Sequence, residues 1–70
     1  MYKKYTENDM NTLQNTFGYY IRCKNAPENY CQGFTISEGT DCVQFLISVV
    51  DASIYSRSKM DNIWLSWIKH

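Results

Sequence analysis

The sequence of 70 residues predicts a mainly α-helical fold of three to four short helices. Three observations favour this class: apolar residues recur at helical intervals, helix-capping residues precede those segments, and acidic residues come before basic ones within them. So short a chain has room for only one hydrophobic core. We therefore expect a single small domain over residues 1–70, in which residues 1–5 form a flexible tail.

The first predicted helix runs from Thr6 to Lys24. Thr6 is followed three residues later by Asp9, which matches a capping box at the start of a helix. Gly18 lies among aromatic and β-branched residues and favours a strand instead, so an extended conformation over residues 17–23 remains open. The apolar residues that would share one helical face are Met10, Leu13, Phe17, Tyr20 and Ile21.

Residues 25–33 predict a short second helix. Asn25 can cap its start, Pro27 suits its first turn, and Gly33 suits its C-terminal end. The residues that follow, 34–36, alternate between apolar and polar and fit an extended segment.

Two further helices are predicted in the second half of the chain. The third follows the turn-forming residues around Gly39, and its helical spacing is carried by Val43, Leu46, Ile47, Val50 and Ile54. Residues 43–49 also alternate as a buried strand would, but the length of the segment favours a helix. The fourth is predicted by the spacing of Met60, Ile63, Trp64, Trp67 and Ile68. The alternative fold class is α+β with a small antiparallel sheet, whose strands would lie near residues 17–23, 34–37, 43–50 and 63–69.

Charge and cysteine usage exclude several classes of protein. Seven acidic and seven basic residues leave no net charge that would draw the whole domain to nucleic acid or to an anionic membrane. The longest apolar cluster is far shorter than the about 20 residues that cross a bilayer. An odd number of cysteines, three, agrees with a reducing compartment. We expect a cytoplasmic protein without membrane contact.

The sequence contains no recognisable catalytic, cofactor-binding or metal-binding motif. The only histidine, His70, is the last residue, so a nucleophile activated by histidine is not expected. The three cysteines, Cys23, Cys31 and Cys42, are spaced too widely for a zinc signature. The glycines match neither a dinucleotide fingerprint nor a phosphate loop. We therefore predict no enzymatic activity, no cofactor and no metal.

Aromatic residues are in excess for so small a core. The chain has six Tyr, three Phe and two Trp, and each large ring can bury about 150–250 Å². Some of these rings must therefore be exposed, and Tyr and Trp are enriched where protein partners dock. For Trp64 and Trp67, which are one helical turn apart, a position in the core is the favoured alternative. The candidate partner-binding residues are Tyr2, Tyr5, Tyr19, Trp64 and Trp67.

By elimination, the sequence predicts a non-enzymatic protein–protein interaction module. We expect a small inhibitor or modulator of a host or cellular enzyme, of the kind that phages and mobile elements use, such as an anti-defence protein. One alternative is a small nucleic-acid-binding regulator, because residues 25–54 have the outline of a helix-turn-helix. It is not favoured, because residues 37–50 contain Glu38 and Asp41 but no Lys or Arg. A second alternative is a protomer of a small homo-oligomer.

Overall fold

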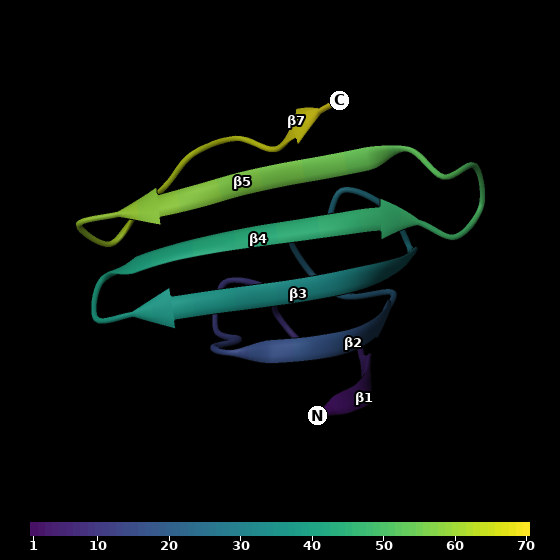
Figure 1. Cartoon of the computed structure of the whole chain (residues 1–70), viewed down its shortest axis with the longest axis horizontal. Helices are drawn as coiled ribbons and strands as arrows, with labels where there is room; N and C mark the ends of the chain where they lie inside the picture. Colours follow the sequence, from purple (N-terminus) through teal and green to yellow (C-terminus); the bar gives the residue numbers. More distant parts are fainter.

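The computed structural model describes all residues, 1–70, and consists of one β-sheet without any helix (Figure 1). The prediction of a mainly α-helical fold is therefore wrong. The strands are β1 (Tyr2–Thr6), β2 (Thr16–Ile21), β3 (Tyr30–Glu38), β4 (Asp41–Ser48), β5 (Ile54–Met60), β6 (Ile63–Trp64) and β7 (Ile68–Lys69). Residues 1–5, for which a flexible tail was expected, contribute most of β1.

The sheet is mixed and follows the order of the chain. Strands β2 to β5 form an antiparallel meander, and β1 adds to β2 in parallel. At the other end of the sheet, the short strands β6 and β7 both pair with the outer edge of β5. Figure 1 shows β7 beside β5. The alternative prediction had placed strands over parts of β2, β3, β4, β6 and β7, but its helical part is absent and it missed β1 and β5.

Strand β4 shows why the helical interpretation of residues 43–54 fails. Its even-numbered residues are buried and its odd-numbered residues are more exposed, which is the two-residue period of a strand. Leu46 is fully buried, whereas its neighbour Ile47 lies on the opposite side of the sheet. The helical spacing was a coincidence: Val43 and Ile47 lie on one side of β4 and Leu46 on the other, while Val50 belongs to the following turn and Ile54 to β5.

The first predicted helix is replaced by a loop and strand β2. Met10 belongs to the loop that folds back over the sheet, and Tyr20 belongs to the strand beneath it, so the two residues meet in the core without sharing a helix. Gly18 faces Gly33 across β2 and β3. The strand character that Gly18 and its neighbours indicated is the interpretation that the structure supports.

The acidic residues that suggested helix N-termini stabilise turns instead. The Asp9 carboxylate accepts hydrogen bonds from the Asn11 backbone N–H and the Asn25 side chain. Asp41 begins β4 directly after a tight turn, in which Gly39 has a φ of 62°. Since turns and helix starts both favour Asp, Asn and Gly, charge order along the chain did not distinguish them.

The segments predicted as the second and fourth helices are also extended. Residues 25–29 form a connection that leads into β3, and the left-handed φ of 60° at Asn25 begins a turn and not a helix. Near the C-terminus, Asp61 and Asn62 have φ values of 53° and 66° and form the two-residue hairpin turn between β5 and β6. The helix-turn-helix outline over residues 25–54 is therefore wrong as well.

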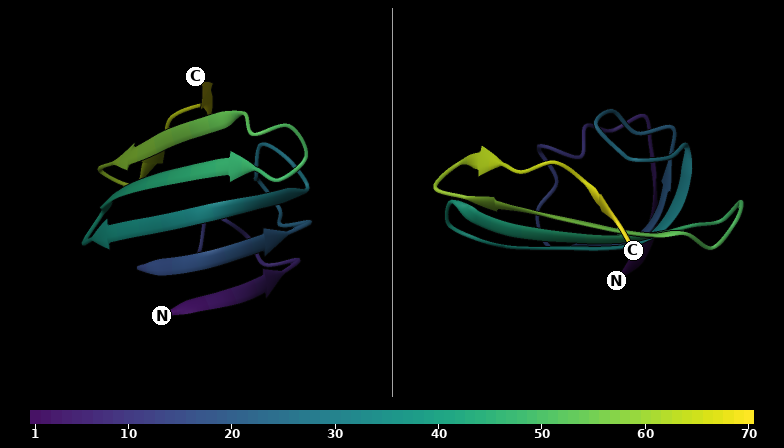
Figure 2. Two further views of the ribbon diagram at one scale, coloured as in Figure 1. Left: turned by 45° about the vertical axis from the view of Figure 1, so that its right-hand side comes forward. Right: turned by 90° about the horizontal axis from the view of Figure 1, so that it is seen from above.

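The hydrophobic core lies on one side of the sheet. Its fully buried members are Met10, Tyr20, Cys31 and Leu46, and partly buried residues from the connections pack around them. The connections 7–15 and 22–29 cover this side, as the view along the sheet shows (Figure 2). The buried Gln44 amide donates to the Met10 carbonyl oxygen at 2.7 Å and so fastens the first connection to β4.

Candidate functional site: the open face of the sheet

Alternation along the strands gives the sheet two very different faces. One, which we name the covered face, carries the core and lies under the connections (Figure 2). The opposite side, which we name the open face, has no segment of the chain folded over it. The large apolar side chains of the open face that remain exposed are Tyr2, Phe17, Tyr30, Ile36, Val43, Ile47, Met60, Ile63 and Ile68. A sheet in a soluble protein normally presents polar residues on its solvated face, so this composition is unusual.

One cross-strand row runs through the middle of the open face. Strand pairing places six residues side by side in the order Tyr2, Phe17, Phe34, Phe45, Ser56 and Ile68. We name this set the aromatic row. The rings of Phe34 and Phe45 are stacked with centroids 5.5 Å apart, and Tyr2 meets Phe17 edge to face at 5.3 Å. Cross-strand aromatic pairs of this kind hold the side chains in fixed positions.

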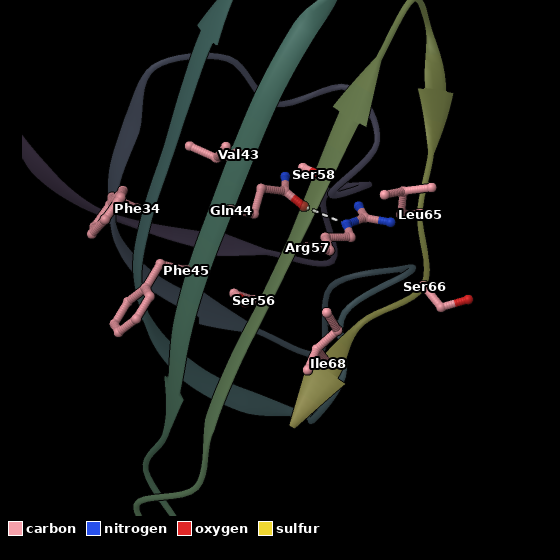
Figure 3. Close-up of a pocket in the computed structure, with 10 residues that line it drawn as sticks. All are labelled: Phe34, Val43, Gln44, Phe45, Ser56, Arg57, Ser58, Leu65, Ser66 and Ile68. Carbon is pink, nitrogen blue, oxygen red and sulfur yellow. Dashed lines mark hydrogen bonds between the residues drawn. The ribbon is translucent and has the colours of Figure 1, made fainter. Parts of the chain in front are cut away.

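The aromatic row changes from large to small residues where it reaches β5. The serines at positions 56 and 58 leave a depression between β4 and the C-terminal segment, with a volume of about 300 Å³ (Figure 3). We name it the serine groove. Val43 and Phe45 border it on one side, and Leu65 and Ile68 border it on the other. The groove can therefore receive a large apolar side chain from a partner.

Charged side chains of the open face lie only at its margin. Lys4 is on the edge strand β1, and the facing pair Glu38 and Asp41 closes the β3–β4 hairpin. Gln32 is the only long polar side chain near the middle, and its carbonyl oxygen accepts a hydrogen bond from the Tyr2 hydroxyl. The centre of the open face is thus apolar and its few charged side chains lie at the margin, which is the arrangement found in protein interfaces.

On the covered face, Arg57 is buried between the two tryptophans. Its guanidinium carbon lies 3.7 Å from the Trp64 ring centre and 4.6 Å from the Trp67 ring centre. It donates to the Gln44 side-chain oxygen at 2.6 Å and to the Asn11 side-chain oxygen at 2.8 Å. Burial lowers the pKa of Arg57 to about 10, and the cation persists at neutral pH. This cluster attaches the C-terminal segment to the sheet.

The five predicted partner-binding residues are divided between the two faces. Tyr2 and Tyr19 lie on the open face. Tyr5 lies on the covered face and stacks on Tyr20 at 5.2 Å. Trp64 and Trp67 contact Arg57, and the Trp67 indole also donates to the Asn25 carbonyl oxygen at 2.8 Å. The structure thus brings only two of the five together on one exposed surface.

Sequence reasoning missed the centre of the open face. Phe34 and Phe45 were not proposed as binding residues, and Phe17 was assigned to a helix core. The signal that could have identified them was the alternation over residues 34–36 and 43–49, which fits strands with one strongly apolar face. Because the chain was interpreted as helical, Phe17 and the apolar cluster that includes Phe45 were assigned to the interior, and Phe34 was expected in a short extended segment.

The cysteines occupy separate positions and are free. Cys31 and Cys42 are buried and Cys23 is partly buried. Burial raises the pKa of Cys31 to about 11 and also raises the pKa of Cys23. No three potential metal-binding side chains come together, and no helix of the length and apolarity needed for a membrane crossing is present.

Comparisons with protein-family models, with curated proteins and with solved structures found no match.

Proposed function

We propose that this chain is a non-enzymatic interaction module that binds a protein surface through the open face of its sheet. The observation that carries the proposal is the aromatic row, which lies uncovered across the centre of that face. Contiguous exposed apolar patches mark interaction sites in soluble proteins, because leaving them in water is unfavourable. Blocking an enzyme by contact, the role expected of a small modulator, needs one such face and no catalytic group.

The edges of the sheet favour contact through the face and disfavour strand addition. The edge strand β1 carries Lys3 and Lys4, and edge lysines oppose pairing with another strand. At the other edge, β6 and β7 have two residues each and are interrupted by the connection 65–67. Two protected edges and an unprotected face point to docking by side chains.

The lack of positive charge on the open face favours a protein partner over nucleic acid. Stacking platforms for single-stranded nucleic acid combine aromatic rings with Lys or Arg side chains that contact the phosphates. Around the aromatic row, Lys4 is the only such side chain, and the hairpin end carries Glu38 and Asp41. Those two carboxylates would repel a phosphate backbone.

The proposal is tested by photo-crosslinking in the native cellular background. A photoreactive phenylalanine analogue replaces Phe17 on the open face or, as a matched control, Val50. Val50 is an exposed apolar residue of the β4–β5 turn, outside the open face. We expect crosslinks to protein from position 17 and none from position 50. Crosslinks to nucleic acid only, or none that depend on position 17, would contradict the proposal.

A further inference from the structure

The structure also indicates which protein surface fits the open face. We infer that the open face is covered by a second copy of this chain, so that two sheets pack face to face as a symmetric β-sandwich dimer. The inference rests on the proposed function, because it names the partner of the same surface; a second copy there takes the place of an enzyme as that partner. Three observations carry it: the size of the face, the distribution of large and small side chains across it, and its charge.

The open face is large enough for a stable dimer. The two longer dimensions of the molecule, 32 and 25 Å, limit the projected face to at most about 800 Å². Stable protein interfaces of standard size bury about 800 Å² on each partner. A second copy would have to cover almost the whole open face to reach this size, and it would complete the two-sheet architecture in which each sheet has an apolar inner side.

The open face has a ridge on one half, which is formed by Phe17, and the serine groove on the other half. Phe17, with 51% of its surface exposed, projects from β2, one strand away from the stacked Phe34. Ser56 lies on β5, one strand away from Phe45, at the floor of the groove. The ridge and the groove belong to the aromatic row. They lie on opposite sides of the midpoint between β3 and β4, at the same distance from it.

A two-fold axis parallel to the strands, between β3 and β4, brings the ridge of each copy onto the groove of the other. Such an axis lays β2 of one copy over β5 of its neighbour and β3 over β4. Phe17 of each copy then enters the serine groove above Ser56 of the other, and the contact occurs twice, as an isologous interface requires. The sheets would be aligned within about 30° and separated by about 10 Å.

The other two-fold arrangement is less favourable. An axis in the same plane but across the strands lays every strand over its own counterpart. Phe17 would then lie on β2 of the second copy and the two serine grooves would face each other, leaving empty space. Close packing of large residues into small ones selects the axis parallel to the strands.

The charge distribution agrees with a dimer of this kind. The residues that would be buried at the centre of the interface, from Phe17 across Phe34 and Phe45 to Ser56, are uncharged. The one ionisable group beside them is the His70 ring, whose Nε2 lies 2.6 Å from Ser56 Oγ and so keeps a hydrogen-bond partner within the chain. Glu38 and Asp41 remain at the solvated margin.

The experiment measures the mass of the purified full-length chain by sedimentation equilibrium over a range of concentrations. We expect a dimer of twice the 8.3 kDa chain mass that dissociates on dilution. Phe17→Ala removes the ridge and Ser56→Phe fills the groove, and each variant should weaken dimerisation at least tenfold. The Val50→Ala variant changes an exposed apolar residue outside the face and should dimerise as the unmodified chain does.

The double variant Phe17→Ala/Ser56→Phe distinguishes this arrangement from a general effect on folding. It exchanges the large and the small residue, so dimerisation should recover to within about threefold of the unmodified chain. Within one chain, three strand spacings of about 4.8 Å separate β2 from β5, so the two positions do not touch and can couple only between copies. Tryptophan fluorescence checks folding, because Trp64 and Trp67 pack against Arg57 on the covered face.

A monomer at all concentrations would overturn the inference, and so would a dimer that Phe17→Ala and Ser56→Phe leave intact or weaken without mutual rescue. These outcomes differ from a failure of the proposed function. A monomeric purified chain whose position 17 crosslinks to another protein in cells would refute the dimer while the open face stays a binding surface. Absence of a protein crosslink that depends on position 17 would contradict both the proposed function and the dimer.

Discussion

The guanidinium carbon of Arg57 lies 3.7 Å from the centre of the Trp64 ring, and this contact attaches the C-terminal segment to strand β5. The same side chain hydrogen-bonds Gln44, whose amide in turn holds the Met10 carbonyl of the first connection. One buried cation thus links the C-terminal segment, strand β4 and the N-terminal loop. The covered face is organised around this polar link together with its small apolar core.

Replacing Arg57 with methionine should destabilise the fold by about 3 kcal/mol. The variant loses two charge-assisted hydrogen bonds and the contacts with both indole rings, and it leaves the buried Gln44 oxygen without its donor. Urea unfolding followed by tryptophan fluorescence measures the loss. Arg22→Met is the matched control, because Arg22 is half exposed and makes one long ion pair of 3.8 Å with Glu7. Equal effects of the two substitutions would contradict the role of Arg57.

Cys31 should make the free energy of unfolding depend on pH above about 9. Burial raises the pKa of its thiol from 9.0 to about 11, so the unfolded chain releases this proton at lower pH than the folded chain does. The contribution is therefore fully present below about pH 9 and is lost as the pH rises to about 11. Between pH 8 and pH 11, the free energy of unfolding measured with denaturant should fall more steeply for the unmodified chain than for Cys31→Val. Parallel curves for the two proteins would contradict the burial of the thiol.

Gly33→Ala should cost about 3 kcal/mol or more. A Cβ atom at this position would lie 1.9 Å from the Phe45 carbonyl oxygen of the neighbouring strand, so the backbones of β3 and β4 would have to separate. Gly39→Ala is the control: its φ of 62° is strained for alanine, but the space around it is empty, and a cost of about 1–2 kcal/mol is expected. Thermal unfolding by circular dichroism ranks the two variants. The reverse order would contradict the close approach at position 33.

The neighbours Leu46 and Ile47 should separate folding from association. Leu46→Ala removes a fully buried core side chain and should cost about 2–5 kcal/mol. Ile47→Ala changes the open face and should lower monomer stability by less than about 1 kcal/mol, while weakening dimerisation. Unfolding is measured at protein concentrations below the dissociation constant of the dimer. If Ile47→Ala lowered the stability of the monomer as much as Leu46→Ala does, the side chain of Ile47 would be buried in the monomer and the face would not be open.

Local sequence signals were informative about turns and misleading about the elements between them. The tight turn at Gly39 was recognised as a turn, and Gly18 with its aromatic neighbours indicated a strand. The apolar intervals favoured helices because strands with large side chains on both faces contain residues three and four positions apart by chance. Acidic residues at turns reinforced the same mistake, since turns and helix starts use the same residue types.

The sequence by itself determined an excess of aromatic side chains, too many for one small interior. Only the tertiary structure decided where they lie. The sheet register aligns Phe17, Phe34 and Phe45 in one row on the open face, while Trp64 and Trp67 enclose Arg57 on the other. The physical reason is that strand pairing joins residues far apart in the chain, and a shift of one residue would move every side chain to the opposite face.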